Sequence, residues 1–492
     1  MAAARDAHRP PRRHAVLPRP HPGRDVPLTL RTRLALLTAA AVCAATATAP
    51  PAQAATDTRL AGRLPSGAAY LMDVPAAWNG TVLLYSHGYT PAGAPNPAQN
   101  APSPATRDRL LDQGYALIGS SYATNGWAVT EAVPDQLATL DLFTKEFGAA
   151  RRTLAWGTSY GGLVTTTLAE RHADRFDGSL SMCGLVQGGV ANWNSTLDPV
   201  FALKTLLAPD ADIPLTGFAD RAAAAGAADA LAAQVTAAQR TPEGRARIAL
   251  AAALHGIPGY NDATQPSPGP ADWRTQQANQ YAALTGLIRL PAFDWRQEAE
   301  SRAGGSMSWN TGVDYTAMLA RSPLRKEVDA LYKEAGVSLG TDLAALNRAP
   351  RISADAPAVR WMRRTSVLTG RLTDPQLNIH TTGDALIPVQ AESAHRRAAT
   401  AAGSGPLLGQ AYVDGPGHCT FTTGEMLAAL HTLEHRLATG RWDTAPGALN
   451  ARAGAEDPTA EARYVPYRPA AYPRPYDRAH DRPGAGTGGF DR

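Results

Sequence analysis

The residues with the clearest potential for chemistry form the pentapeptide GTSYG at 157–161, with Ser159 at its centre. A serine hydroxyl becomes an effective nucleophile when a neighbouring base takes its proton. The glycines two positions before and after the serine let a strand and a helix pass closely at a sharp turn, which exposes the hydroxyl. A strand-like stretch at 152–156 precedes the motif and a helical pattern at 162–172 follows it. This context favours a nucleophilic serine over a simple glycine-rich turn.

A base and an acid should follow Ser159 along the chain, because the imidazole that accepts the proton must be held in one tautomer. Asp384 stands directly after an expected strand at 376–380, where its carboxylate would reach the edge of a sheet. His418 follows another expected strand, at 409–413, on a loop rich in Gly and Pro. These positions predict His418 as the base and Asp384 as the acid that orients it.

Alternatives to this acid are present nearby. Asp374 precedes a proline before the strand, and Asp414 lies four residues from the histidine, so neither is placed as well as Asp384. Asp384 itself would otherwise cap a helix or stabilise a turn. His380 is expected to be a strand residue rather than the base.

Acyl transfer also needs hydrogen-bond donors for the negative oxygen that develops on the substrate. The backbone N–H of Tyr160, directly after the serine, is one expected donor. The other is the N–H of Tyr89, in the sequence SHGY at 86–89 after an expected strand at 81–86. The alternative for this second segment is an ordinary turn that ends the strand.

A zinc-binding pattern competes with the serine interpretation. The sequence HTLEH at 431–435 matches H-x-x-E-H, which places two histidines on one helical face. It lies on an amphipathic helix expected at 425–438, and no further acidic ligand is clearly placed beyond it. An exposed helix face is the simpler interpretation, so we expect no metal and no cofactor.

The elements that must position these residues alternate between strands and helices, which is typical of a mostly parallel sheet covered by helices. The chain changes character over 186–368, where Ala-rich helical segments are broken by Pro/Gly loops. We expect a core made of 55–185 and 369–443, with 186–368 inserted as a helical cap, and a disordered Pro/Arg/Tyr-rich tail at 444–492. The first core segment should contain strands at 69–74, 81–86, 115–120, 152–156 and 179–182, and helices at 106–113, 135–147 and 162–172.

Residues 1–54 have the features of a signal peptide with a long amino-terminal region. Arg31 and Arg33 precede an apolar run at 34–49, and the sequence AQA at 52–54 offers a cleavage site after Ala54. The run is short and Ala-rich for a membrane span, so a stable membrane anchor is the less favoured alternative. We therefore expect a secreted protein.

Charge argues against nucleic-acid binding. The chain has 47 Lys and Arg and 43 Asp and Glu. Removing the eight Arg and two Asp of residues 1–54 leaves 39 basic and 41 acidic residues in the mature protein. Proteins that bind the phosphate backbone of nucleic acids usually carry an excess of basic residues, which the mature protein lacks. No nucleic-acid partner is therefore expected.

The mature protein would keep two of the three cysteines, because Cys43 lies in the leader. An even pair in an exported protein suggests one disulfide, between Cys183 and Cys419. Two buried free thiols are the alternative.

The motifs taken in order resemble the α/β-hydrolase superfamily: HG at 87–88, GTSYG at 157–161, GD at 383–384 and GH at 417–418, within about 60–440. The resemblance implies an α/β-hydrolase fold, with helices on both faces of a mostly parallel sheet and the helical cap inserted before the strand that bears the acid. It also implies two-step acyl transfer by a Ser-His-Asp triad.

A narrower similarity concerns the cysteine that directly follows His418. Tannases and feruloyl esterases join a Cys beside the catalytic His to one beside the catalytic Ser. This chain has Thr158 before Ser159 instead, although Cys183, at the end of the next strand, could reach the same loop. The similarity therefore implies an anchored histidine loop more than an aromatic ester substrate.

These observations predict a secreted serine hydrolase that cleaves carboxylic esters. An exopeptidase or amidase on the same fold is the alternative, with a peptide or amide in place of a small ester, and a noncatalytic binding protein on this scaffold is a third possibility. The cap should decide the substrate. Its tryptophans are core residues by default, but some would line an apolar pocket: Trp193, Trp273, Trp295 and Trp309.

Overall fold

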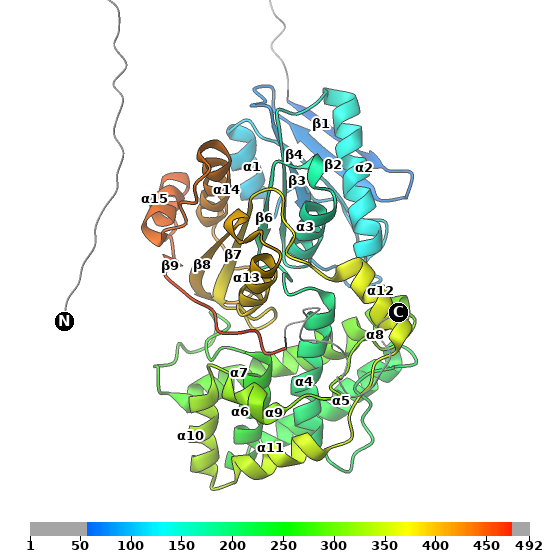
Figure 1. The fold of residues 1–492 in the computed structure, drawn as a ribbon, viewed down its shortest axis with the longest axis vertical. Coiled ribbons are helices and arrows are strands. Elements are labelled where there is room, and N and C mark those ends of the chain that lie inside the picture. Colours follow the sequence, from blue (N-terminus) through cyan, green and yellow to red (C-terminus); the bar gives the residue numbers. More distant parts are fainter. Residues whose placement is uncertain (1–56, 475–492) are drawn as a thin grey trace, which may run out of the picture. The chain divides into compact units, whose positions relative to one another are not determined.

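The computed structural model describes residues 57–474. The expected signal peptide, its cleavage site and Cys43 lie outside the described residues, as does the end of the chain from residue 475. Within the described part, one sheet and two groups of helices form the molecule (Figure 1).

The sheet has nine strands in the order β1-β2-β4-β3-β5-β6-β7-β8-β9. Pairing is parallel from β4 through β3, β5, β6 and β7 to β8, and antiparallel at the two edges. The predicted mostly parallel sheet is therefore confirmed. The strands are β1 (Thr58–Arg63), β2 (Ala69–Val74), β3 (Thr81–Ser86), β4 (Ala116–Ser120), β5 (Arg152–Thr158), β6 (Gly178–Met182), β7 (Gln376–Gly383), β8 (Leu408–Pro416) and β9 (Tyr464–Val465).

Helices cover both faces of the sheet, as predicted. Along β3, Val82 and Leu84 pack into one apolar cluster, while Leu83 and Tyr85 pack into another on the opposite face. Both faces of β3 are buried, which explains why its sequence is a continuous apolar run. The helices that contribute to the first cluster include α2 (Val129–Phe147), α3 (Tyr160–Arg171) and α13 (Ala391–Ala401), and those of the second include α1 (Pro104–Asp112), α14 (Thr423–Thr439) and α15 (Pro446–Glu456).

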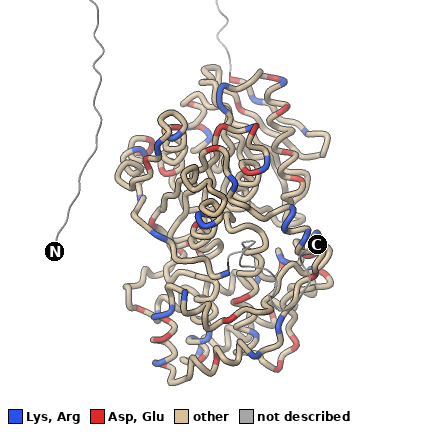
Figure 2. Tube along the Cα trace, in the orientation of Figure 1, with Lys and Arg blue, Asp and Glu red and all other residues tan. Residues whose placement is uncertain are grey.

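All the regular elements described between β6 and β7 are helical, and we call residues 186–368 the cap. Figure 1 shows most of the cap helices gathered beyond one end of the sheet, around their own apolar core. Basic and acidic residues are interspersed in both the sheet region and the cap (Figure 2). The cap elements are α4 (Gly189–Leu207), α5 (Arg221–Ala238), α6 (Pro242–His255), α7 (Trp273–Leu287), the π-helix η2 (Ile288–Asp294), α8 (Trp295–Ala303), α9 (Tyr315–Ala320), α10 (Arg325–Ala335), α11 (Leu339–Arg348) and α12 (Ala356–Ser366). The buried apolar residues of α8 and α12 join the cluster of α2 and α3 instead of the apolar core of the cap.

The prediction of a disordered tail from residue 444 is wrong for the part of the tail that the structure describes. Helix α15 packs Leu449 and Ala453 against the core, and β9 adds a short antiparallel strand to β8. Tyr464 is buried and donates a hydrogen bond to the Glu425 carbonyl at 2.7 Å. This segment is held by a few apolar residues that lie far apart in a Pro/Arg-rich stretch. Amino-acid composition alone does not indicate that such a segment is ordered.

After β9 the chain crosses to the cap and ends, within the described residues, against α4 (Figure 1). The Tyr472 hydroxyl donates to Ser195 Oγ at 2.8 Å. The Arg474 guanidinium lies 3.3 Å from the carboxylate of Asp198, which is fully buried. Burial raises the pKa of Asp198, and Arg474 is the first of the groups that oppose this shift.

We expect Arg474→Ala to lower the free energy of unfolding by about 3 kcal/mol near pH 8, because it leaves the Asp198 carboxylate buried without its closest cation. The loss should be smaller near pH 5, where Asp198 can take up a proton more readily. Urea unfolding at both pH values measures the effect. Arg468→Ala, an exposed position on the same segment, is the control, and equal stability of the two variants would contradict the prediction.

Candidate active site

Ser159 sits at the tip of a tight turn between β5 and α3. Its φ of +56° is unusual for a residue with a side chain, and such strain is typical of a nucleophile elbow. The flanking glycines are required, since a Cβ on Gly161 would collide with the Ser86 carbonyl and one on Gly157 with the Gly161 carbonyl. The sequence thus folds so that the Ser159 hydroxyl stands at the carboxyl end of the sheet.

The acid and the histidine leave two adjacent parallel strands at that same end. Gly383, the last residue of β7, pairs with Pro416, the last residue of β8. The loop after β8 is tied back to β7 by the Gly417 N–H, which donates to the Gly383 carbonyl at 3.0 Å. Asp384 and His418 therefore emerge side by side.

The structure brings the three predicted residues into one hydrogen-bonded chain. His418 Nε2 lies 2.7 Å from Ser159 Oγ, and His418 Nδ1 lies 2.6 Å from Asp384 Oδ2. The side chain of Asp384 is fully buried, whereas that of His418 is 20% exposed. In this geometry a neutral His418 with its proton on Nδ1 can accept the serine proton at Nε2.

The surroundings of Asp384 keep it ionised. Burial alone would raise the pKa of this carboxyl, but the neighbouring imidazoles of His418 and His380 outweigh burial and lower the pKa to about 2. The other oxygen, Oδ1, accepts hydrogen bonds from the N–H groups of Leu386 and Ile387, both at 2.9 Å. Asp384 is thus fixed in orientation as well as in charge. The alternative acids are elsewhere: Asp414 accepts from Thr382, and Asp374 accepts from Thr373.

The two expected oxyanion donors lie on segments next to the serine. Tyr160 is the first residue of α3, so its N–H has no partner within the helix. Gly88 lies beside the serine, since a Cβ on it would be in van der Waals contact with Ser159 Cβ at 3.7 Å. Tyr89 follows directly, and the ring of Tyr89 packs edge-on against that of Tyr160, with centroids 5.9 Å apart. Both N–H groups stay predicted donors.

His87 holds this second segment in place. Its ring is buried, stacks on Tyr122 with centroids 4.0 Å apart, and lies 3.1 Å from the Ser121 carbonyl through Nε2. His87 therefore holds this segment through its own contacts, in addition to its place in the turn.

A disulfide joins Cys183, at the end of β6, to Cys419, next to His418, with their Cα atoms 5.4 Å apart. Cys183 N–H donates to the Ile379 carbonyl on β7, so the anchor belongs to the sheet. The bond links the loop that carries His418 to the strand beside the one that carries Ser159.

We expect Cys183→Ala to lower kcat by about ten- to a hundred-fold, because a His418 displaced by about 1 Å no longer meets Ser159. Stability should fall by up to about 5 kcal/mol for a closed loop of this size, 236 residues in sequence separation. Ester turnover and thermal unfolding of the mature protein, before and after reduction with a phosphine, measure both effects. Reduced wild type should match the variant; full activity after verified reduction would contradict the prediction.

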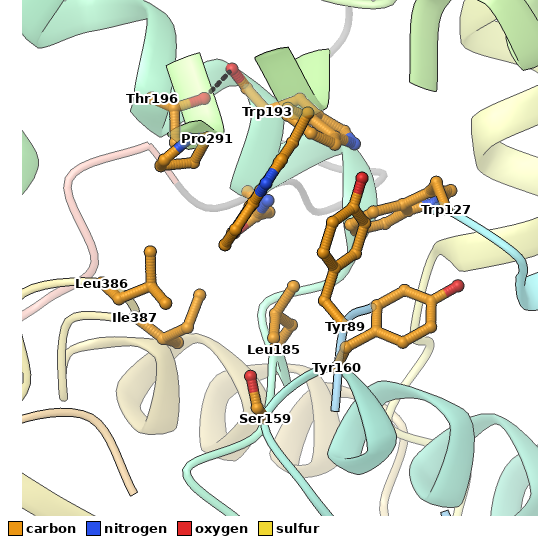
Figure 3. Close-up of a pocket in the computed structure, with 12 residues that line it drawn as sticks. Tyr89, Trp127, Ser159, Tyr160, Leu185, Trp193, Thr196, Pro291, Leu386 and Ile387 are labelled. Atoms are coloured by element: carbon orange, nitrogen blue, oxygen red, sulfur yellow. Dashed lines mark hydrogen bonds between the residues drawn. The ribbon is translucent and has the colours of Figure 1, made fainter. Parts of the chain in front are cut away.

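A small, mostly apolar pocket opens above Ser159 (Figure 3). Figure 3 shows the serine hydroxyl pointing toward the space enclosed by the aromatic rings. Of the four cap tryptophans, Trp193 and Trp295 line the pocket, whereas Trp273 and Trp309 pack in apolar clusters. The lining consists of Tyr89, Trp127, Tyr160, Leu185, Asn192, Trp193, Thr196, Pro291, Trp295, Leu386 and Ile387, with Ser159 itself.

The H-x-x-E-H side chains have protein partners. Glu434 accepts a hydrogen bond from the Tyr115 hydroxyl at 2.6 Å, and His431 Nδ1 lies 3.3 Å from Glu456. Within residues 57–474, the one group of three metal-type ligands close enough to share an ion is Cys183, His418 and Cys419, whose cysteines form the disulfide. These contacts favour the interpretation of HTLEH as part of a helix face.

A mostly parallel sheet with a strained serine between β5 and α3, and with an acid and a histidine beyond β7 and β8, is the architecture of α/β-hydrolases. Comparison with known proteins agrees. The profile of the Prolyl oligopeptidase family matches residues 115–232. The chain is 30% identical to the o-phthalyl amidase of Xanthobacter agilis over 429 residues, which cover 82% of this chain and 93% of that protein. This chain therefore belongs to the α/β-hydrolase superfamily of serine hydrolases, in the family of that amidase.

Solved structures show weaker likeness. Feruloyl esterase B from Aspergillus oryzae is 14% identical with a TM-score of 0.36, covering 77% of this chain and 80% of that one. An esterase from the same organism is 12% identical with a TM-score of 0.38, covering 77% and 79%. At these TM-scores the likeness says nothing about substrate.

Proposed function

We propose that this chain is a secreted serine hydrolase that cleaves small carboxylic esters bearing an aromatic ring. The observation that supports this substrate is the pocket above Ser159, whose walls include Trp127, Trp193, Trp295 and Tyr89. Aromatic walls bind flat apolar groups by burying their surface and by edge or face contacts between rings.

The mechanism that follows is two-step acyl transfer. Ser159 Oγ attacks the carbonyl carbon while His418 Nε2 takes the serine proton, and Asp384 stabilises the imidazolium that forms. The N–H groups of Tyr160 and Tyr89 hold the oxyanion. His418 then gives the proton to the leaving alcohol, and water, activated by the same histidine, releases the acid and frees the serine.

Amide cleavage is the second candidate, and the relationship to an o-phthalyl amidase favours it. The same groups would act, with His418 protonating the departing amine. The pocket suits an aromatic acyl group in either case, so the two candidates differ in the leaving group alone.

A panel of matched substrates tests the proposal: the 4-nitrophenyl esters of benzoic and acetic acid, with the 4-nitroanilide of benzoic acid and monoesters and monoamides of phthalic acid. We expect the benzoyl ester to have the higher kcat/KM of the two esters. Trp295→Leu should reduce that preference, while Trp273→Leu, outside the pocket, should leave it unchanged. Turnover of the acetyl ester alone would overturn the aromatic assignment, and turnover of amides without esters would select the second candidate.

Export is proposed from the leader sequence. Among the helices of residues 57–474, none is both long enough and apolar enough to cross a membrane. The disulfide is compatible with an oxidising compartment. Amino-terminal sequencing of the protein from culture medium should begin at Ala55; recovery of an uncleaved chain from the membrane fraction would contradict secretion.

A further inference from the structure

A second buried histidine lies behind the candidate triad. His380 is on β7, four residues before Asp384, and its side chain is fully buried. Its Nε2 lies 3.3 Å from Asp384 Oδ2, the same oxygen that contacts His418. His380 and His418 therefore share one oxygen of the acid.

The other ring nitrogen of His380 faces a second carboxylate. Nδ1 lies 3.2 Å from Oε1 of Glu392, on α13, and Nε2 also lies 2.9 Å from the Ile387 carbonyl. Glu392 Oε2 accepts hydrogen bonds from the amides of Asn378 and Gln410, at 2.8 and 2.6 Å. Donors of this kind favour the ionised form of Glu392.

Both ring nitrogens of His380 thus face oxygens of carboxylates, which accept hydrogen bonds when ionised. A neutral imidazole carries one N–H and could satisfy one of these carboxylates, whereas an imidazolium donates to both. Burial lowers the pKa of His380, but contacts with Asp384 and Glu392 outweigh it and raise the pKa to about 10.

The remaining titratable groups around this pair do not supply a cation in direct contact with it at rest. Burial lowers the pKa of His255, on α6, and of His395, on α13, so both are neutral near pH 7. His418 must also be neutral before the reaction to act as a base. The ionisable groups that face the pair are Asp384, Glu392, His418, His255, His395 and Tyr412. The cation of Arg396 reaches Glu392 through Gln410, whose Oε1 accepts from Arg396 at 3.0 Å while its amide donates to Glu392.

We propose that His380 is a positioning residue of the active site, a permanent buried imidazolium that joins Asp384 to Glu392 and offsets their charge. Two buried carboxylates without a cation would stabilise the protonated form of His418. The positive charge of His380 offsets that bias. His380 also gives Asp384 Oδ2 a second donor besides His418, which restricts the orientation of the carboxylate.

The charge of His380 can be measured in the wild-type protein, without substrate. Histidine-selective ¹⁵N labelling and NMR of the mature protein should show one imidazolium, with protons on both ring nitrogens, that persists at pH 8. The resonance is assigned by its loss in His380→Gln. A neutral tautomer at pH 8 would overturn the proposal. Because this readout is independent of turnover, it separates failure of the inference from failure of the proposed hydrolase function, on which its kinetic consequence rests.

Kinetics supply the second test. We expect His380→Gln to move the acid limb of the kcat/KM profile upward by about one pH unit, because it removes a cation that contacts Asp384, the partner of the base. His395→Gln is the matched control: the same change at another buried histidine, which lies 2.9 Å from Asn378. Its acid limb should stay at the wild-type pH. If His380→Gln loses stability while its acid limb does not move, the residue has only a structural role.

Discussion

Replacing Ser159 by alanine should lower kcat by about 10⁶-fold, because no other group in the elbow can form the acyl-enzyme. The variant should keep its fold, since the strained turn depends on the glycines around it and alanine removes only the hydroxyl. Hydrolysis of an aryl ester measures the loss, and an active-serine phosphonate probe shows directly whether the nucleophile is gone. Wild type should label with one equivalent and the variant with none.

Ser267→Ala provides the control for this experiment. Ser267 is an exposed serine in a cap loop, so the variant should keep both activity and labelling. Equal labelling of Ser159→Ala and wild type would remove Ser159 as the nucleophile, and an unlabelled wild type would point to a noncatalytic protein on a hydrolase scaffold.

The parts of the site that could be predicted depend on local rules. The elbow around Ser159 has a steric requirement that is written in two glycines, and the order of acid and histidine follows from the strand order of the fold. The predicted strands at 69–74 and 81–86 agree with β2 and β3. β3 was predictable because a buried parallel strand is a continuous apolar run. The superfamily and the fold class could therefore be predicted from the sequence.

The rest depends on contacts between distant segments. Trp127 follows β4 yet shares the pocket with cap residues, and nothing in its local sequence indicates this role. Edge strand β1 was missed because its residues are only partly buried, in alternation with exposed ones. Glu392, on α13, meets Asn378 and His380 of β7 only through the folding of the chain. The spacing of four between His380 and Asp384 was the single local sign of that cluster.

The residues proposed for catalysis and those proposed for substrate selection come from different parts of the structure. The groups proposed to break the bond lie at the ends of β5, β7 and β8, on the rigid sheet. Many of the groups that would select the substrate come from α4, η2 and α8 of the cap, together with Tyr89 and Trp127. Because Tyr472 and Arg474 contact α4 of the cap, changes at these two residues should alter substrate choice before they alter the catalytic groups.

The second large effect on kcat is expected from replacing the acid, Asp384. Asp384→Asn should lower kcat by about 10⁴-fold, comparable with loss of the acid in other Ser-His-Asp triads. Oδ1 accepts two backbone N–H groups, so the amide oxygen of asparagine should occupy that position and its NH₂ should face His418 Nδ1. A donor there favours the tautomer with the proton on Nε2, which can no longer accept the serine proton. Steady-state kinetics with an aryl ester, at matched folding by circular dichroism, measure the loss.

Asp414→Asn is the matched control, since Asp414 lies near the end of β8, before the histidine loop, but is exposed and bonded to Thr382. Its kcat should stay within about two-fold of wild type, as is usual for surface changes away from the reacting groups. If Asp414→Asn were the inactive variant and Asp384→Asn retained its activity, the acid would have to be reassigned. The buried cation of His380 would then serve only to neutralise Asp384 and Glu392 within the core.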